Sequence, residues 1–471
     1  MSLTIAEIAE IAGGRIQGLD PGLIITGKVE FDSRKVSAGD LFLAFHGENV
    51  DGHDYVEAAL AAGAVAAITT GPVPAGSVLV TDPIEAITRL AVAHVLRLPS
   101  AMTIIGITGS SGKTSTKDLL AQVLSRHGRT VATPQSFNNE LGFPYTALLA
   151  GPDTEYLILE TSARGIGHIQ HLTEIVPPRI GAVLNVGSAH LGEFGSVEAI
   201  AKAKGELIEA LPSASDGGIA VLNADDQLVR SMSARTSARV VTFGEQAGAD
   251  VRAERVQIGQ DGRATFDLVA TGESGLPVAL QVRGAHQVSN ALAAAAIAIN
   301  CGMPAEQVAL ALSAAEPRSA WRMEVTDTPD GITVINDAYN ANPESMRAAL
   351  KALATMSTGR RSIAVLGQMA ELGDSSAAEH DAVGRLIVRF DISQLLAVGE
   401  VARPIAHGAA LEGSWNGESE WLPDVAAAVD RLAEFARPGD VVLVKGSRSA
   451  GMERVAAALI AQHTVAAEPA L

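Results

Sequence analysis

Short apolar runs alternate with amphipathic stretches along most of this chain. In its middle part, the run at 102–108 leads into a glycine-rich loop, and apolar residues at helical spacing follow over 113–128. Further apolar runs at 156–160, 180–186 and 218–223 each lead into polar or small residues. Runs of this length that alternate with helical patterns predict a largely parallel sheet covered by helices.

The same alternation suggests three predicted domains. Residues 1–100 hold short strand-like pieces and end in a predicted helix. Residues 101–314 contain the glycine-rich loop and close with the alanine-rich stretch 289–302, which predicts a buried helix. Residues 315–471 repeat the strand–helix alternation. We therefore predict an α/β protein with a small N-terminal domain, a central domain with a mostly parallel sheet, and a C-terminal α/β domain.

Length and charge exclude several classes of protein. The 471 residues are too many for one ordinary core. A net charge of −18, without a run of Lys or Arg, argues against a general nucleic-acid-binding protein. No apolar stretch reaches the roughly 18 residues of a membrane span. The N-terminus carries Glu7 and Glu10 and lacks the basic start of a signal peptide, and Cys301 is the only cysteine. We therefore predict a soluble cytoplasmic protein without an internal disulfide.

The segment GITGSSGKT at 106–114 carries the clearest chemistry. It follows an apolar strand and opens a helix, which is the setting of a phosphate-binding loop. Small residues let main-chain N–H groups approach phosphate oxygens, and the helix dipole adds positive charge. Lys113 would reach the terminal phosphates, and the Thr114 hydroxyl would bind Mg²⁺. The alternative, a glycine turn that binds nothing, fits this Gly-Lys-Thr context poorly.

Two acidic or basic side chains at strand ends are further candidates for this site, and two lysines in a predicted helix are not indicated by local sequence. Glu160 ends an apolar run at the sheet edge where α/β proteins bind ligands, and its carboxylate suits Mg²⁺. His190 also follows a run, either as a metal ligand or as a hydrogen-bonded structural residue. Lys202 and Lys204 lie in a predicted helix, where local sequence favours exposure to solvent.

The C-terminal part has polar residues at its own predicted strand ends. The turn INDAYNANPESM sets Asp337, Tyr339, Asn340 and Asn342 between a strand and a helix, which suits a ligand site, although such a turn needs no function. Lys445 and Arg448 follow a later strand, and two cations there suit a carboxylate or a phosphate. Arg322 lies near the link from the central domain.

Taken together, these motifs resemble the Mur ligases, which build the stem peptide of peptidoglycan and carry TGxxGKT in place of the strict phosphate-loop spacing. The resemblance covers nearly the whole chain in order. Residues 32–64 resemble the N-terminal domain of the members that add the third residue and the terminal dipeptide. YNANP at 339–343, together with NNE at 138–140, resembles the dipeptide-adding member. Other matching segments are NVGSAHLGEFGS, AKAKGE, LNADD, NALAAAA, RMEV and VKGSRSAGMERV.

The resemblance implies a fold and an activity. It implies an N-terminal UDP-sugar-peptide-binding domain, a central P-loop ATPase domain and a Rossmann-like C-terminal domain. The implied activity joins D-Ala-D-Ala to UDP-N-acetylmuramoyl-tripeptide through an acyl phosphate. ATP, two Mg²⁺ ions and a carbamylated lysine would take part, and the protein would act as a monomer.

The resemblance also implies roles for individual residues. The loop Gly109, Ser110, Ser111, Gly112, Lys113, Thr114 and Ser115 would hold the ATP phosphates. Thr114 and Glu160 would bind one Mg²⁺ and His190 the second, with Lys204 as the carbamylated ligand, which replaces its interpretation as a surface residue. Lys113, His190 and Lys204 form the catalytic set. The nucleotide would contact Asn290, Arg322 and Asp337. The substrates would contact Ser33, Arg34, Asn138, Asn139, Ser162, Arg164, Tyr339, Asn340, Lys445 and Arg448.

Three alternatives stay open from the sequence. A sister ligase that adds a different residue is favoured slightly by Thr161 and Ser162, which stand where the dipeptide-adding member has Met-Gly. A non-catalytic relative would be expected to lose Lys113, Glu160, His190 or Lys204, and all four are present. A simple P-loop kinase or NTPase would need neither the N-terminal domain nor the Lys204 segment.

Overall fold

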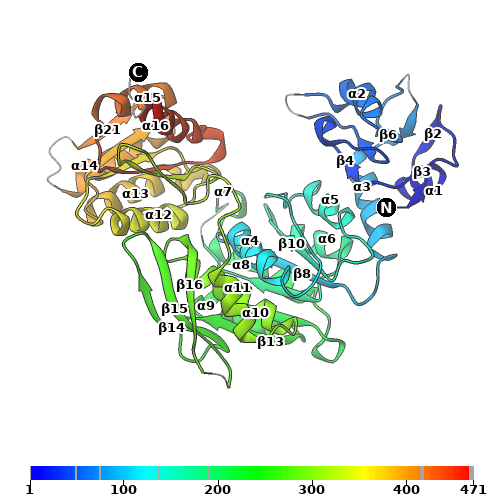
Figure 1. The fold of residues 1–471 in the computed structure, drawn as a ribbon, viewed down its shortest axis with the longest axis horizontal. Coiled ribbons are helices and arrows are strands. Elements are labelled where there is room, and N and C mark those ends of the chain that lie inside the picture. Colours follow the sequence, from blue (N-terminus) through cyan, green and yellow to red (C-terminus); the bar gives the residue numbers. More distant parts are fainter. Residues whose placement is uncertain are drawn as a thin grey trace.

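The fold was analysed in a computed structural model of the chain (Figure 1). The structure describes residues 2–47, 50–73, 76–135, 137–187, 191–272, 274–413 and 418–465. Three α/β parts follow one another, with the N-terminal and C-terminal parts on opposite sides of the central one (Figure 1). Within the described ranges, no helix is long and apolar enough to cross a membrane.

The N-terminal part is a five-stranded sheet with the order β2-β7-β6-β5-β4, in which only β2 runs antiparallel. Its strands are β2 (Arg15–Gln17), β4 (Val29–Glu30), β5 (Leu41–Leu43), β6 (Ala66–Thr69) and β7 (Ser77–Leu79), beside a small pair of β1 (Leu3–Thr4) and β3 (Ile24–Ile25). Its helices are α1 (Ile5–Ala12), α2 (Val56–Ala61) and α3 (Pro83–Val95).

The central part is a nine-stranded sheet with the order β16-β15-β14-β13-β12-β11-β8-β10-β9. Pairing is parallel from β9 through β14, which confirms the predicted mostly parallel sheet, whereas β14, β15 and β16 form antiparallel hairpins. The strands are β8 (Thr103–Thr108), β9 (Thr130–Ala132), β10 (Tyr156–Glu160), β11 (Ile180–Val183), β12 (Ile219–Asn223), β13 (Arg239–Gly244), β14 (Val251–Ile258), β15 (Arg263–Ala270) and β16 (Leu276–Arg283).

Helices cover both faces of the central sheet, because residues on its parallel strands are apolar on both sides. One face packs against α4 (Lys113–Leu124), α10 (Gln287–Asn300) and α11 (Ala305–Ser313). The other packs against α5 (Gly142–Leu148), α6 (His168–Ile175), α8 (Val197–Glu209) and α9 (Gln227–Ser231). The predicted buried helix at 289–302 is therefore confirmed as α10, whose alanines allow close packing on α4. The short α7 (Leu191–Phe194) lies near the C-terminal part.

The C-terminal part is a six-stranded sheet with the order β17-β18-β22-β19-β20-β21, parallel except for β17. The strands are β17 (Glu324–Asp327), β18 (Thr333–Asp337), β19 (Ser362–Leu366), β20 (Gln394–Val398), β21 (Ser419–Leu422) and β22 (Val441–Lys445). Helices α12 (Pro343–Met356), α13 (Ser376–Arg389) and α14 (Arg403–Glu412) cover one face, and α15 (Val425–Phe435) and α16 (Glu453–Val465) the other. This layout confirms the predicted α/β architecture.

One hydrophobic core joins the N-terminal and central parts. Helix α3 packs on α5, and Phe31 makes an edge contact with Tyr145 at a ring-centroid distance of 4.9 Å. The Tyr145 hydroxyl donates to the carboxylate of Glu30 at 3.5 Å. These contacts fix the N-terminal part against α5 and the face of the central sheet that α5 and α6 cover.

Candidate active site

A cavity of about 990 Å³ lies between the central and C-terminal parts. Its walls come from the ends of parallel strands and from the helices that follow them, which is where α/β proteins bind ligands. Most of the residues predicted from sequence line it. They are Ser110, Ser111, Gly112, Lys113, Thr114, Ser115, Asn138, Asn139, Glu160, Ser162, Arg164, Asn290, Arg322, Asp337, Tyr339, Asn340, Lys445 and Arg448.

The glycine-rich loop joins β8 to α4 and forms part of the cavity wall. Gly112 is the N-terminal cap of α4 and has φ +81, a left-handed conformation that favours glycine. A Cβ there would lie 2.3 Å from Oδ1 of Asn290, so α10 also requires glycine at this position. The Lys113 ammonium donates to the carbonyl of Gly109 at 2.8 Å. Burial lowers the pKa of Lys113 below its usual range.

Two predicted Mg²⁺ ligands are in direct contact. The Thr114 hydroxyl donates to Oε2 of Glu160 at 3.0 Å, and the Asn138 amide donates to Oε1 at 2.7 Å. Glu160 is only 1% exposed. A buried carboxylate beside a hydroxyl is a set of hard oxygen donors that fits Mg²⁺.

Lys204 lies in α8 and is only 4% exposed, so the local expectation of a surface lysine is wrong. Burial, and after it the charge of Lys113, lower the pKa of Lys204 well below its ordinary value. A neutral amine is the form that reacts with CO₂, so this environment fits the carbamylation that the family resemblance implies. His190 lies outside the described residues.

On the C-terminal side, a buried ion pair holds Asp337. The Lys445 ammonium lies 2.6 Å from Oδ2 of Asp337 and donates to the carbonyl of Asn340 at 2.9 Å. In this arrangement Lys445 supports Asp337 and the Asn340 turn, and its contact with an incoming dipeptide stays a prediction. The Arg322 guanidinium lies 4.2 Å from the centroid of the Tyr339 ring.

Arg448 and Arg164, which were predicted to contact substrate, each contact side chains of the protein. Arg448 lies 4.2 Å from the centroid of the Trp321 ring and pairs with Glu453 at 2.9 Å. Arg164 in the central part approaches Glu371 in the C-terminal part at 3.7 Å. Both arginines remain on the cavity wall, where a polar ligand could compete for them.

The predicted substrate residues divide between the cavity and the N-terminal part. Ser162 donates to the carbonyl and to Oδ1 of Asn138, both at 3.1 Å, so these two side chains form one polar group. Ser33 and Arg34 lie in the N-terminal part, in a short 3₁₀ turn after β4, where Arg34 pairs with Asp32 at 2.8 Å. That hydrogen bond lowers the pKa of Asp32 to about 2. The structure does not bring Ser33 and Arg34 into the cavity wall.

Three segments match models of one protein family: its catalytic domain at 27–99, the Mur ligase middle domain at 107–298 and the glutamate ligase domain at 321–448. A Mycobacterium tuberculosis protein (strain H37Rv) named UDP-N-acetylmuramoyl-tripeptide–D-alanyl-D-alanine ligase is 49% identical over 98% of this chain and 99% of its own. This chain belongs to the Mur ligase family.

Other Mur ligases agree over the whole length. An Escherichia coli K12 protein with the same printed name is 34% identical, covering 98% of each chain. A crystal structure of MurF from Acinetobacter baumannii superposes with a TM-score of 0.85 at 31% identity, covering 98% of this chain and 99% of that one. MurF from Thermotoga maritima, solved in complex with ADP, gives a TM-score of 0.77 at 28% identity and covers 94% of this chain and 99% of that one.

The sequence did not indicate a role for Asn185 in this Mur ligase cavity, and it indicated Asn342 without the contact that Asn342 makes. Asn185, just beyond β11, accepts from the main chain of Ser111 at 2.9 Å and so braces the glycine-rich loop. Asn342 caps α12 and also donates to the carbonyl of Ser110 at 3.3 Å across the two parts. Asn185 lies at the end of a predicted strand, and a polar residue at that position could have been predicted to line a ligand site. Nothing local in the sequence indicates the contact between Asn342 and Ser110.

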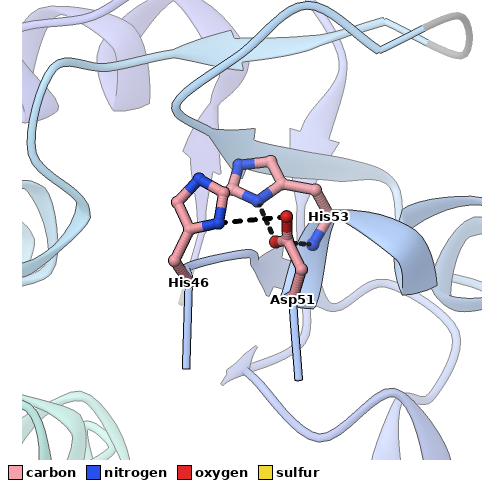
Figure 2. Close-up of side chains that lie close together, drawn as sticks. All are labelled: His46, Asp51 and His53. Atoms are coloured by element: carbon pink, nitrogen blue, oxygen red, sulfur yellow. Dashed lines mark hydrogen bonds and ion pairs between the residues drawn. The ribbon is translucent and has the colours of Figure 1, made fainter. Parts of the chain in front are cut away.

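Outside the cavity, His46, Asp51 and His53 lie close together in the N-terminal part (Figure 2). Their residue types suit a metal, but the hydrogen bonds do not. Nε2 of His53 accepts from the main-chain N–H of Thr70 at 3.0 Å, so the neutral ring carries its proton on Nδ1 and donates to Asp51 at 2.6 Å. A metal at Nδ1 would have to displace that proton. These hydrogen bonds therefore indicate a structural role for the three residues, which stabilise the short helix after Asp51.

Proposed function

We propose that this Mur ligase joins D-alanyl-D-alanine to UDP-N-acetylmuramoyl-tripeptide and uses one ATP for each bond. The observation that carries the proposal is the single cavity that combines the glycine-rich loop, the Thr114–Glu160 pair and the Asp337–Asn340 turn. The relatives that carry this ligase's name support it, since they range from 32% to 49% identity over nearly the whole chain. The alternative of a sister ligase that adds the third residue is not favoured by these names.

The residues suggest how the chain would assist the reaction. A tripeptide carboxylate oxygen attacks the γ-phosphorus of ATP, giving an acyl phosphate and ADP. The loop N–H groups and Lys113 would hold the phosphates and offset their charge. The deprotonated amine of the dipeptide then attacks the acyl carbon, and the tetrahedral intermediate collapses with loss of phosphate. Walls from two domains would exclude water, which would otherwise hydrolyse the acyl phosphate.

Thr114 and Glu160 would hold one Mg²⁺ ion, and His190 would help to hold the second. Lys204 in its carbamylated form would be a further Mg²⁺ ligand. When bound, Mg²⁺ supplies positive charge that offsets the crowded phosphate oxygens. The buried oxygen pair of Thr114 and Glu160 and the buried amine of Lys204 support this assignment. The nucleotide base and ribose would lie toward Asn290, Arg322 and Asp337.

We assign the UDP-sugar peptide to residues 1–100, ATP to residues 101–314 and the closing domain to residues 315–471. Ser33, Arg34, Asn138, Asn139, Ser162 and Arg164 would contact the tripeptide substrate. Tyr339, Asn340, Lys445 and Arg448 would lie toward the dipeptide. The expectations of a monomer and of a cytoplasmic location stay part of the proposal, and light scattering of the purified protein tests the first.

The proposal is tested by phosphate release in a mixture of protein, Mg²⁺, ATP, UDP-N-acetylmuramoyl-tripeptide and D-Ala-D-Ala. We expect release only in the complete mixture, and little when either peptide substrate is left out. Rapid release without the tripeptide would instead indicate a simple NTPase. No release in any mixture would indicate a non-catalytic relative.

A further inference from the structure

Lys117 is a buried lysine that the reaction described above does not use. It lies on α4, one turn beyond Lys113, and is 3% exposed. Its ammonium donates to the carbonyls of Thr133 at 2.8 Å and Gln135 at 2.9 Å, and pairs with Asp118 at 2.8 Å. An ammonium has three N–H donors, and three acceptors surround this one. Lys117 is therefore a fixed connection between α4 and the chain that leaves β9.

That chain leads directly to the predicted substrate residues. The Thr133 hydroxyl accepts from the main-chain N–H of Glu160 at 3.0 Å. Gln135 has φ +49, a conformation that non-glycine residues adopt only when their surroundings hold it. Asn138 follows three residues later and donates to Oε1 of Glu160 at 2.7 Å. The ammonium of Lys117 thus holds the base of the loop whose tip carries Asn138 and Asn139.

The partner of Lys117 makes a second connection. The other carboxylate oxygen of Asp118 accepts from the hydroxyl of Ser319 at 2.5 Å, in the link between α11 and β17. Ser319 lies three residues before Arg322, which packs on Tyr339 at the cavity. Lys117 and Asp118 therefore join the Asn138 loop, the phosphate-loop helix and the link to the C-terminal part.

We infer that Lys117 is a positioning residue for the UDP-sugar peptide, which it serves by holding the Asn138–Asn139 loop in place. The inference rests on the proposed function, in which these asparagines contact the tripeptide substrate. Lys117 binds main-chain carbonyls of this loop and not the phosphate loop, whereas the predicted Mg²⁺ ligand Glu160 contacts the loop through Thr133 and Asn138. We therefore expect the loss of Lys117 to act on the tripeptide more than on ATP. A purely structural lysine on α4 would affect both substrates alike, since α4 begins at the ATP phosphates.

The test compares Lys117→Met, Asn138→Ala and the double variant in steady-state kinetics. Methionine keeps the length and helix propensity of lysine without its charge. We expect Lys117→Met to raise KM for UDP-N-acetylmuramoyl-tripeptide about tenfold, while KM for ATP changes less than about twofold. Because both residues act through one loop, the double variant should raise the tripeptide KM little beyond the larger single effect.

Gln122→Met is the matched control. Gln122 also lies on α4, but its side chain binds the main chain of Glu316 in the interdomain link, at 2.9 and 3.0 Å, and does not touch the Asn138 loop. We expect its tripeptide KM to stay near that of the wild type. Calorimetric binding of ADP to every variant shows whether the central part is folded, and Lys117→Gln serves as the second variant if Lys117→Met does not fold.

The outcomes separate this inference from the proposed function. Equal rises in both KM values, or fully additive effects of Lys117→Met and Asn138→Ala, would overturn the positioning role. A tripeptide KM that is unchanged in both Lys117 variants would overturn it as well. If the wild-type protein neither binds the tripeptide in calorimetry nor turns it over, the proposed function itself fails, and the inference fails with it.

Discussion

Removal of the cation from the buried pair of Lys445 and Asp337 should destabilise the C-terminal part strongly. Lys445 is 2% exposed and lies 2.6 Å from the Asp337 carboxylate. Removing one partner of a buried pair leaves the other charge uncompensated, which costs about 3–5 kcal/mol. Asp337 would keep the main-chain N–H of Met323 at 3.0 Å and is 15% exposed at its side chain. We therefore expect Lys445→Met to cost about 3 kcal/mol, at the lower end of that range.

Scanning calorimetry measures this effect as the melting temperature of the C-terminal part. For a domain of its size, about 3 kcal/mol corresponds to a decrease of roughly 6–12 °C. The double variant Lys445→Met, Asp337→Asn should recover most of the loss, because no buried charge remains. Arg403→Met, which breaks an exposed pair with Glu400 in the same part, should leave the melting temperature unchanged. A Lys445→Met shift no larger than that of Arg403→Met would refute the reasoning, as would a double variant as unstable as the single one.

Three further changes test other parts of the account. Lys204→Ala should lose ligase activity that added short carboxylic acids partly restore, and full activity without them would exclude carbamylated Lys204 as a ligand. Gly112→Ala should abolish ATP binding in calorimetry, because the φ of Gly112 is +81 and a Cβ there would lie 2.3 Å from Asn290. The control Gly248→Ala, at a position with no atom near the added Cβ, should bind ATP normally. Normal ATP binding by both variants would contradict the loop geometry. Burial raises the pKa of Tyr145 to about 12, so the unfolded chain ionises first, and stability should fall as pH rises from about 10 to about 12. Unfolding measured on either side of this interval should show a smaller fall in Tyr145→Phe, and an equal fall in both proteins would be inconsistent with a buried hydroxyl.

The sequence predicted the parts of the site that follow from strand order. Glu160 ends β10 and the glycine-rich loop follows β8. These two strands pair in parallel, so their carboxyl ends meet at one edge of the sheet. An apolar strand followed by Gly-Ser-Ser-Gly-Lys-Thr needs no tertiary information to predict a phosphate site. For the same reason the α/β architecture was predictable from alternating apolar runs.

Side chains whose role depends on packing between distant elements were harder to predict. Lys204 sits in an amphipathic helix beside Lys202, and local sequence does not distinguish the two. The family resemblance singled out Lys204, and the packing of α8 buries it. The contact of Asn342 with Ser110 joins residues more than 200 positions apart, and the antiparallel hairpins β14–β16 follow runs that resemble any other strand. The shared core of α3 and α5 likewise crosses the predicted boundary at residue 100.

The central claim is the identity of the bond that this protein makes. The most direct measurement is the mass of the product after incubation with ATP, Mg²⁺, UDP-N-acetylmuramoyl-tripeptide and an equimolar mixture of D-Ala-D-Ala, D-Ala and diaminopimelate. The account predicts one product, whose mass gain equals D-Ala-D-Ala less one water. A gain that matches a single amino acid, or the release of phosphate without any gain in mass, would contradict it.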